Sequence, residues 1–308
     1  MSSQPGLWQQ IRQDNRDWSV SSNRLGSIGR TFFIFPQGKG PKGSYSNFTD
    51  LAPNLRSRDV IILGGVLREQ AIAPLDVYDV TIIGAANTPR QSTSGGAPTG
   101  GGATWMLPTS PVATTPLLEV RAAGWAFENI EFTPANASAA VRLTRSAAVD
   151  TIDASHARFS GCYFAGNGGT TQNGIEDNGG SSRVLVEDCR FEGLGGTAIL
   201  SLSTANSVPL GWRIAKNRFQ QNLNDIKMSL SYAIIELNRF MTSGSGAANK
   251  IISDTFIATQ GGFNHILLNQ FSNTEVEIAP GNGYTGASTD VWMNYVNNQA
   301  ALAFGQPA

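Results

Sequence analysis

The sequence has few charged residues and few of the residues that hold metals. Only 15% of its 308 residues are Asp, Glu, Lys or Arg, against about 25% in a typical globular protein. Two cysteines, Cys162 and Cys189, and two histidines, His156 and His265, form no zinc spacing, so neither a metal nor a cofactor is predicted. The formal net charge of −1 gives no basic surplus, so nucleic acid is not an expected partner.

Long apolar runs are also missing. No stretch approaches the ~20 consecutive apolar residues of a transmembrane helix, so no membrane span is predicted. The first residues, Met1 to Trp8, lack the basic segment followed by an apolar stretch that marks a secretory signal peptide. The sequence therefore predicts a soluble protein that is made in the cytoplasm.

Glycine is abundant, at 34 residues, and serine, threonine and asparagine are common. These residues prefer turns and caps to helix interiors, so the composition disfavours a helix-rich protein. The apolar fraction of 41% is ample for a core, which excludes a disordered chain.

One short motif recurs along the chain: an apolar residue, two further residues, then Ile, Cys or Asn, one residue, and Phe. Most copies are followed by a polar, Gly-rich turn and a second apolar pulse. A segment this short cannot bury its own apolar face, whereas stacked copies can, as in solenoid proteins. The copies span 127–132, 159–164, 186–191, 214–219, 235–240 and 266–271.

The position two residues before each Phe carries the strongest detail. In a parallel stack, equivalent side chains of neighbouring coils lie ~4.8 Å apart. Asn217, Asn238 and Asn269 are therefore expected to form a hydrogen-bonded ladder inside the coil, which solves the problem of burying a polar amide. Cys162 and Cys189 occupy the same position, and a cytoplasmic origin favours free, packed thiols on neighbouring coils.

This pattern resembles the parallel β-helix repeat of pectate lyases, polygalacturonases and phage tailspikes. The resemblance covers residues 43–296 and implies an all-β fold, a single right-handed parallel β-helix (a solenoid). The segment 47–51 resembles the short helix that often precedes the first coil. The segments 59–66 and 79–84 resemble the strands of that coil.

The two ends lack the repeat. Residues 1–42 are expected to form an N-terminal cap or a virion-attachment segment, in which 30–35 is a strand that enters the first coil. A long polar loop is expected at 86–115. A last strand is expected at 291–296, followed by a short C-terminal tail at 297–308.

The resemblance carries expectations about function. The Arg-x-Pro-x-x-Arg element of pectate lyases, the Gly-His-Gly of polygalacturonases and the Asp-Phe-Ile-Phe-Gly of pectin methylesterases are missing, so cleavage of pectin is not expected. An extended β-helix without a secretion signal is typical of a tailed bacteriophage, whose virion is assembled in the host cytoplasm. The resemblance to tailspikes therefore implies a structural or receptor-binding virion protein, such as a tailspike, tail fibre or other exposed appendage, that engages a host surface glycan.

The same resemblance implies a homotrimer whose other partners are virion proteins and the host cell-surface polysaccharide. Three alternatives stay open: a polysaccharide depolymerase (glycoside hydrolase or lyase) on the same scaffold, a capsid decoration protein, and a bacterial surface-binding module.

Candidate catalytic residues come from the carboxylates, because cleavage of a glycosidic bond needs an acid and a base or nucleophile. Glu176 and Asp177 lie in a Gly-rich frame, and Asp188 flanks the Cys189 position of its own motif copy and is expected to point outward, so these three are the candidates for a groove along the solenoid. The ordinary alternative is that they are solvated turn residues. The other residues considered are Asp150, Asp153 with His156, Glu187, Glu192 and, for stacking on sugars, Tyr163, Trp212, Tyr232 and Trp292.

Overall fold

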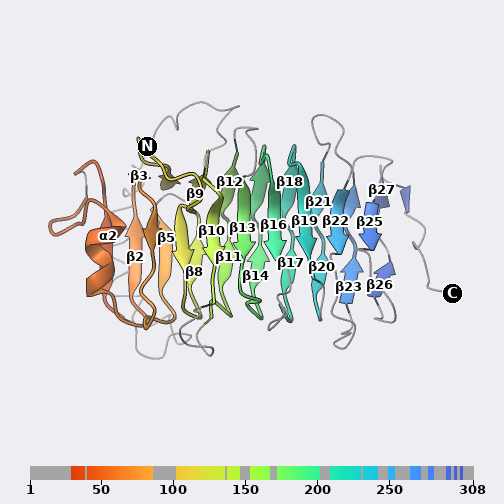
Figure 1. Cartoon of the computed structure of the whole chain (residues 1–308), viewed down its shortest axis with the longest axis horizontal. Coiled ribbons are helices and arrows are strands. Elements are labelled where there is room, and N and C mark those ends of the chain that lie inside the picture. Colours follow the sequence, from red (N-terminus) through yellow and green to blue (C-terminus); the bar gives the residue numbers. More distant parts are fainter. Residues whose placement is uncertain are drawn as a thin grey trace, which may run out of the picture.

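The computed structural model confirms the predicted fold, a single right-handed parallel β-helix (Figure 1). Each full coil contributes one strand to each of three sheets, named A, B and C in the order in which the chain passes through them. In the part of the chain that the structure describes, no helix is long and apolar enough to cross a membrane. The described residues are 29–38, 40–85, 102–135, 137–145, 153–166, 172–201, 209–229, 232–241, 249–253, 264–271, 277–280, 289–292, 295–296 and 299–300.

Sheet A has ten strands, all parallel. Its interior positions are apolar, as in Phe127, Phe159 and Val186, which pair in register on successive coils. The strands are β1 (Thr31–Ile34), β2 (Val60–Leu63), β5 (Thr81–Gly84), β8 (Ala126–Glu128), β11 (Arg158–Ser160), β14 (Leu185–Glu187), β17 (Arg213–Ala215), β20 (Ile234–Glu236), β23 (Asn264–Leu267) and β26 (Thr289–Trp292).

Sheet B also has ten strands, and only its last pair, β27 with β28, is antiparallel. The phenylalanines that end the sequence motif all lie in it and point inward. The strands are β3 (Val66–Arg68), β6 (Thr104–Met106), β9 (Glu131–Thr133), β12 (Tyr163–Ala165), β15 (Arg190–Glu192), β18 (Arg218–Gln220), β21 (Arg239–Phe240), β24 (Gln270–Phe271), β27 (Tyr295–Val296) and β28 (Gln299–Ala300).

Sheet C has eight parallel strands and contains the second apolar pulse of each repeat. Val141, Ile175, Ile199 and Ile226 are paired in register and fully buried. The strands are β4 (Ala71–Ile72), β7 (Leu118–Val120), β10 (Ala139–Leu143), β13 (Asn173–Asp177), β16 (Thr197–Ser201), β19 (Asn224–Met228), β22 (Asn249–Ser253) and β25 (Glu277–Pro280).

Both corners that flank sheet A turn on a single left-handed residue. At the A-to-B corners from β8 to β24 φ lies between 52° and 61°, and at the C-to-A corners from β5 to β20 between 53° and 79°. Such values favour Gly, Asn and Asp over other residues. The A-to-B residues are Asn129, Gly161, Asp188, Lys216, Leu237 and Leu268. The C-to-A residues are Asp79, Gly124, His156, Arg183, Gly211 and Tyr232.

The phenylalanines of sheet B form a continuous stack along the solenoid axis. From Phe132 to Phe271 successive ring centroids lie 4.6–5.2 Å apart and the planes are inclined by 3–14°. Isolated aromatic pairs prefer offset or edge-to-face contacts, so the strand repeat of ~4.8 Å imposes the parallel stack. The rings from Phe164 to Phe240 are each covered by the rings of the coils above and below.

The predicted asparagine ladder is confirmed. Asn217 Nδ2 donates to Asn238 Oδ1 (3.1 Å), and Asn238 Nδ2 donates to Asn269 Oδ1 (3.0 Å). The same oxygens accept from the main-chain N–H groups of Asn217 (2.9 Å) and Asn238 (3.0 Å). Each of these oxygens thus accepts from a main-chain N–H group at the corner of the preceding coil as well as from the side-chain amide of that coil. Burial of these polar groups therefore leaves their hydrogen bonds intact.

The two cysteines continue this column in the preceding coils. Both are free and buried, as predicted. The N–H of Cys189 donates to Asn217 Oδ1 (2.8 Å), which links the thiol positions to the ladder. Burial raises the pKa of the Cys189 thiol well above its usual value, so this thiol is held in its unreactive protonated form.

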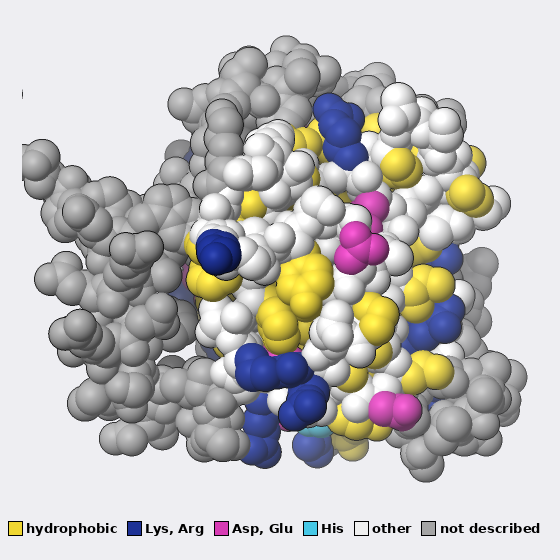
Figure 2. All heavy atoms as spheres, turned by 90° about the vertical axis from the view of Figure 1, so that its left-hand side faces the viewer, with side chains coloured by type: hydrophobic (Ala, Val, Ile, Leu, Met, Phe, Trp, Pro, Cys, Tyr) yellow, Lys and Arg dark blue, Asp and Glu magenta, His cyan; other side chains and the backbone are white. Residues whose placement is uncertain are grey.

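A short helix covers the first coils at the N-terminal end. Helix α2 (Phe48–Leu51) is followed by a 3₁₀ turn, η1 (Ala52–Asn54), and its N-cap Asn47 accepts from Asp50 N–H (2.7 Å). Phe48 is fully buried 5.5 Å from Trp105 and 6.2 Å from Trp125, measured between ring centroids. From this end, apolar side chains are visible in the middle of the face with Lys and Arg side chains below them (Figure 2).

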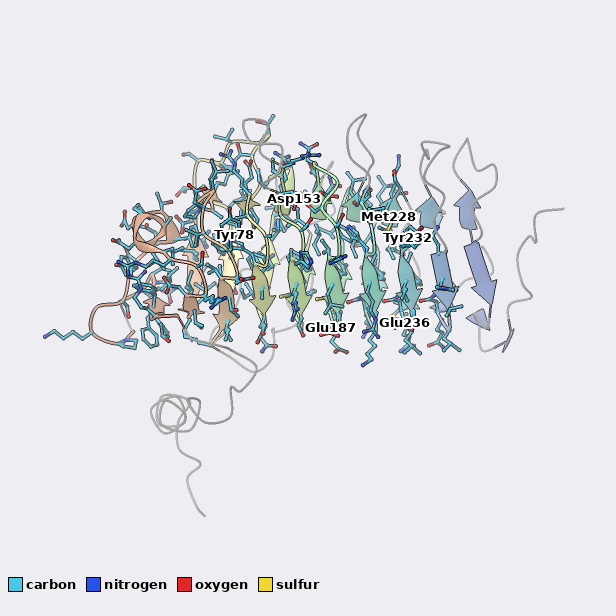
Figure 3. All side chains as sticks on the ribbon, turned by 90° about the horizontal axis from the view of Figure 1, so that it is seen from below. Tyr78, Asp153, Glu187, Met228, Tyr232 and Glu236 are labelled. Atoms are coloured by element: carbon cyan, nitrogen blue, oxygen red, sulfur yellow. The ribbon has the colours of Figure 1, made fainter. Side chains whose placement is uncertain are left out.

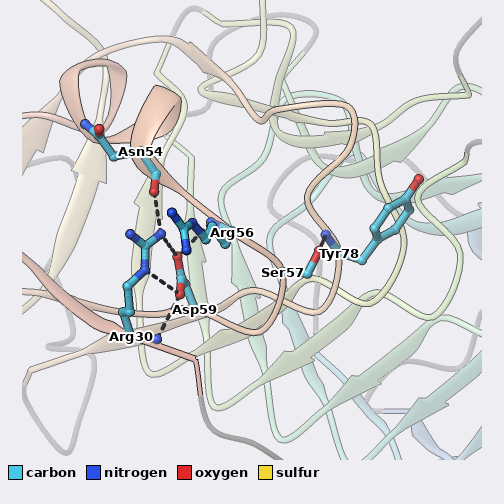
Figure 4. A network of polar contacts seen from close by, with 6 residues as sticks. All are labelled: Arg30, Asn54, Arg56, Ser57, Asp59 and Tyr78. Atoms are coloured by element: carbon cyan, nitrogen blue, oxygen red, sulfur yellow. Dashed lines mark hydrogen bonds and ion pairs between the residues drawn. The ribbon is translucent and has the colours of Figure 1, made fainter.

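The buried carboxylate of Asp59 fastens β1 to the first coil (Figure 4). Its oxygens accept from the Arg30 N–H (2.8 Å), the Arg30 guanidinium (2.8 Å) and the Arg56 N–H (2.7 Å). Arg30 also donates to the Asn54 carbonyl (2.5 Å). A charged group at the solenoid end is thereby fully paired.

The structure refines several predicted boundaries. The strand predicted at 30–35 is β1, which already pairs with β2, before the solenoid start predicted at 43. The segment 86–115 is not one loop, because Thr104–Met106 forms β6 around the buried Trp105; residues 86–101 lie outside the described residues. The strand predicted at 291–296 is two strands, β26 and β27. The rest of the predicted N-terminal cap, 1–28, and residues 301–308 of the predicted tail also lie outside them.

We expect Asn238→Leu to lower the free energy of unfolding by several kcal/mol. The substitution removes the acceptor of Asn217 and the donors to Asn269 and to the Ile214 carbonyl, and each unsatisfied buried group costs ~1–3 kcal/mol. The decrease in the free energy of unfolding is measured by urea unfolding followed by circular dichroism. Asn178→Leu, at an exposed position after β13, is the control. Equal unfolding midpoints for the two variants would contradict a stabilising ladder.

Candidate functional site

The structure does not bring the three predicted catalytic residues together. Glu176 lies on the outer face of sheet C, where Arg142 Nε pairs with its Oε1 (3.0 Å) and Asn173 Nδ2 donates to its Oε2 (3.0 Å). Asp188 is exposed, as predicted, and forms the left-handed A-to-B corner of its coil (φ 52°). Asp177 points into the interior.

The Asp177 carboxylate is a structural group inside the coil. Its oxygens accept from the N–H groups of Gly179 (3.2 Å) and Ser181 (3.0 Å) and from Ser201 Oγ (2.7 Å). Burial raises the pKa of Asp177 to about 6, against the opposing effect of these hydrogen bonds. The side chain therefore closes the turn after β13 and is sequestered from solvent.

The other candidates are dispersed as well. Asp153 Oδ1 accepts from Ser155 N–H (2.8 Å), while His156 takes the left-handed corner position next to it. Glu187 lies on the outer face of sheet A. Trp212 is buried, Tyr232 is exposed, and Asp150 lies outside the described residues.

A different set of polar side chains is aligned on the outer face of sheet B. Each sequence motif has an inward residue at the corner and an inward Phe, so the residue between them points outward. On successive strands this residue is in register, and the strands stack ~4.8 Å apart. We call this set the sheet B column: Glu131, Tyr163, Arg190, Arg218, Arg239 and Gln270.

Two side chains of the column, Tyr163 and Arg190, are held together by Glu192, which points outward two residues after Arg190. Arg190 forms an ion pair with Glu192 on the same strand (2.6 Å). The Tyr163 hydroxyl donates to Glu192 Oε2 (2.7 Å), and the Arg190 guanidinium lies 5.2 Å from the centre of the Tyr163 ring. The carboxylate thus holds both a phenol and a guanidinium in fixed orientation.

The column begins with a carboxyl group whose proton affinity is unusual. Glu131 is only 4% exposed, and burial raises its pKa to about 7. Burial and the hydrogen bond to Glu192 also raise the pKa of Tyr163. A buried carboxyl group whose pKa is raised to near neutral pH is typical of functional sites.

The far end of the column carries an excess of positive charge. Arg218 donates to Gln220 Oε1 (3.0 Å), which is uncharged, and Arg239 is exposed. The buried Nε atoms of Arg190 and Arg218 have no hydrogen-bond partner among the described residues. Three arginines on consecutive strands therefore face one paired carboxylate, Glu192. Such a surface can hold an anion with regularly spaced acidic groups.

Sequence reasoning identified Glu192 and Tyr163 singly but missed the column. The signal was present in the repeat, because the residue between the ladder position and Phe reads Glu131, Tyr163, Arg190, Arg218 and Arg239 in order. What the sequence does not contain is the burial that perturbs Glu131. The described residues include no group of three or more His, Cys, Asp or Glu placed to hold a metal ion.

The three parallel sheets and the internal ladders make this chain a parallel β-helix protein. No protein-family model and no curated protein matches the sequence. Similar solved structures include a pectin methylesterase from Aspergillus niger (14% identity, 90% of this chain and 87% of the other covered, TM-score 0.47). They also include the pectate lyase Pel9A (14% identity, 90% and 82% covered, TM-score 0.49). Likenesses this distant define neither a family nor an activity for the chain.

We expect Asp177→Asn to flatten the pH dependence of stability. Because the folded pKa of about 6 lies above the ordinary value of 3.8, this group's contribution is fully present below about pH 4 and is lost as the pH rises through about 6. Asn keeps the shape but has no proton to lose, so the stability difference between variant and wild type should change by at most about 3 kcal/mol across this range. Urea unfolding of both proteins at several pH values measures this stability difference. Asp188→Asn is the exposed control, and identical pH slopes for wild type and Asp177→Asn would overturn the assignment.

Proposed function

We propose that this β-helix binds an acidic polysaccharide along the outer face of sheet B. The observation that carries the proposal is the run of Arg190, Arg218 and Arg239 on consecutive strands, one cation per coil. Guanidinium groups bind carboxylate, sulfate and phosphate groups through paired hydrogen bonds. A linear polymer with repeated acidic groups matches a column of this kind better than a compact ligand does.

In the middle of the column, Arg190 is held in a fixed orientation before any ligand binds. Tyr163 and Glu192 fix the orientation of Arg190, so little conformational freedom is lost when a ligand binds. Exposure increases from the buried Tyr163 through the half-buried Arg218 to the exposed Arg239. The ligand is therefore expected to contact mainly the Arg218 and Arg239 end.

We infer that the biological setting is a tailed-bacteriophage virion, in which the chain is a tailspike, tail fibre or other exposed appendage that engages the host surface glycan. The support is the extended solenoid, together with the resemblance of its repeat to that of phage tailspikes. A homotrimer is the oligomer expected for such a protein. Antibody labelling of purified phage particles whose genome encodes the chain tests the setting, and particles that lack the protein would refute it.

We expect Arg218→Gln to weaken binding of acidic polysaccharides by about 10- to 100-fold, since a hydrogen bond to a charged group contributes ~1.5–3 kcal/mol. The probes are alginate, heparin and neutral dextran, titrated by calorimetry. Wild type should bind at least one acidic polymer and not dextran. Arg183→Gln, at the exposed C-to-A corner, is the charge-matched control. Equal losses in both variants, or none in Arg218→Gln, would exclude the column as the site.

Glu131 supports a second candidate function, a depolymerase. With a pKa of about 7, this carboxyl group is about half protonated at neutral pH. A general acid of that strength can protonate the leaving oxygen of a glycosidic bond. Among the described residues, Glu192 is the carboxylate that lies on this face beside the column. Pectin remains an unexpected substrate, because the sequence signatures of pectin-cleaving enzymes are missing.

If the chain cleaves the host surface glycan, we expect Glu131→Gln to reduce the rate by ~10²–10⁴-fold. The wild-type rate should fall as the pH rises through about 7, because the protonated form is the active one. Reducing-end release measures both. Glu176→Gln and Asp188→Asn are tested in parallel: a large loss in either, with Glu131→Gln unaffected, would favour the carboxylates chosen from sequence and sink the assignment of Glu131.

A further inference from the structure

The two cysteines stand at equivalent positions of consecutive coils, and the proposed glycan site does not use them. Cys162 and Cys189 are the only cysteines of the chain, and both are free and buried. Each occupies the A-to-B corner of its coil, in the column that the asparagine ladder continues. The pair lies halfway along the solenoid, between the fifth and sixth strands of sheet A, next to Glu187, which Figure 3 labels.

The strand register on both sides of the corner brings the two cysteines level with each other. Ser160 pairs with Glu187 before the corner, and Tyr163 pairs with Arg190 after it. At the corner itself the Arg190 N–H donates to the Cys162 carbonyl (2.9 Å). Strands paired in this way lie ~4.8 Å apart, and disulfides join residues whose Cα atoms are about 4.4–6.8 Å apart. The main chain is therefore already at disulfide distance.

The side chains of this column contact their equivalents from coil to coil. In the ladder, Asn217 Nδ2 lies only 3.1 Å from Asn238 Oδ1. The two thiols are in contact in the same way. After burial, the hydrogen bond with the Cys162 side chain is the next cause that raises the pKa of Cys189.

Each sulfur has only weak hydrogen bonds to give up. Cys162 Sγ donates to the Phe127 carbonyl (3.4 Å), and Cys189 Sγ donates to the Glu187 carbonyl (3.2 Å). Thiols are weak donors, and the Glu187 carbonyl also accepts from the Gly161 N–H (3.2 Å), so it stays paired when the thiol turns away. Rotation of the two side chains about their Cα–Cβ bonds is therefore the main change that an S–S bond requires.

We propose that Cys162 and Cys189 form a disulfide between successive coils when the folded chain meets a peroxide, and that this bond holds the two halves of the solenoid together. The disulfide closes residues 162–189, one complete coil, into a covalent ring. It needs no ligand on sheet B and is independent of glycan binding.

The reaction has two steps and uses hydrogen peroxide as the oxidant. In the first, one thiol loses its proton and its sulfur attacks the peroxide, so that an S–O bond forms, the O–O bond breaks and hydroxide leaves. In the second, the other thiol attacks the sulfenic sulfur, so that the S–S bond forms and the S–O bond breaks. The released hydroxyl groups take up the two thiol protons. Two thiols and one peroxide thus give one disulfide and two water molecules.

The setting of the pair suits a lasting cross-link. Redox-sensor cysteines are exposed and have a low pKa, whereas these two are buried and the pKa of Cys189 is raised, so the reaction is slow and only a small oxidant enters. In a solenoid each coil contacts only its neighbours, and unfolding propagates from coil to coil. A covalent bond in the middle of the stack interrupts that propagation.

The first test treats the reduced, folded full chain with hydrogen peroxide, alkylates it in denaturant and maps its tryptic peptides by mass spectrometry. We expect a peptide pair joined through Cys162 and Cys189, with neither cysteine alkylated. Two alkylated cysteines, or separate sulfinic and sulfonic acids, would overturn the proposal.

The double variant Ile130→Cys with Cys162→Ala is the matched control. It keeps two thiols in the same column but places them two coils apart, at about 9.6 Å, which is beyond disulfide reach in the folded chain. It is expected to form no internal disulfide. As much disulfide in this variant as in wild type would show that the bond forms in unfolded chains, and would equally overturn the proposal.

The second test measures the melting temperature of the peroxide-treated chain by circular dichroism, before and after reduction. For a closed loop of about 28 residues, the lost freedom of the unfolded chain raises the folding equilibrium constant by roughly several hundred-fold, or the melting temperature by about 5 °C in a chain of this length. Cys162→Ala, treated in parallel, undergoes the same methionine oxidation and should show no increase. A cross-linked wild type that melts no higher than its reduced form would exclude a stabilising role.

Discussion

The structure depends on one constraint, the hydrogen bonding of parallel strands between successive coils. It fixes a translation of ~4.8 Å per coil, and every side chain is thereby placed directly above its equivalent in the preceding coil. The core of an ordinary globular protein can mix residue types freely. Here a residue type that packs well against itself is favoured at each position, as the stacked phenylalanines from Phe132 to Phe271 illustrate.

The same constraint explains how the coil tolerates buried polar groups. A single asparagine at the A-to-B corner would leave part of its amide unsatisfied. Asn217, Asn238 and Asn269 avoid this because each supplies what the next one needs, and their oxygens also accept from main-chain N–H groups. In earlier coils the position is filled by Cys189, Cys162 and Ile130, which are buried apolar groups. The column therefore changes from polar to apolar only once, at the junction between Cys189 and Asn217.

The fold could be predicted from sequence because inward positions repeat. Ladder residues, phenylalanines and second apolar pulses recur with recognisable spacing, and sheet membership follows from them. The site could not be predicted in the same way. Glu176 and Asp177 are neighbours in sequence, but strand alternation sends one to the outer face of sheet C and the other into the core. Their shared Gly-rich context gave no indication of that separation, and the burial of Glu131 depends on tertiary structure that no local pattern encodes.

Function on such a scaffold must be sought in the outward columns, since the inward ones serve the stack. A column of like charges is disfavoured by repulsion at ~4.8 Å unless counter-charges or a ligand intervene. The two described faces deal with this repulsion differently. On sheet A, arginine and glutamate alternate between coils, and Arg213 pairs with Glu236 of the next coil (2.7 Å), so opposite charges lie close to one another. On sheet B, Arg190, Arg218 and Arg239 follow one another with a single carboxylate among them. An unbalanced run of this kind is the physical basis on which an anionic polymer is proposed as the ligand of sheet B.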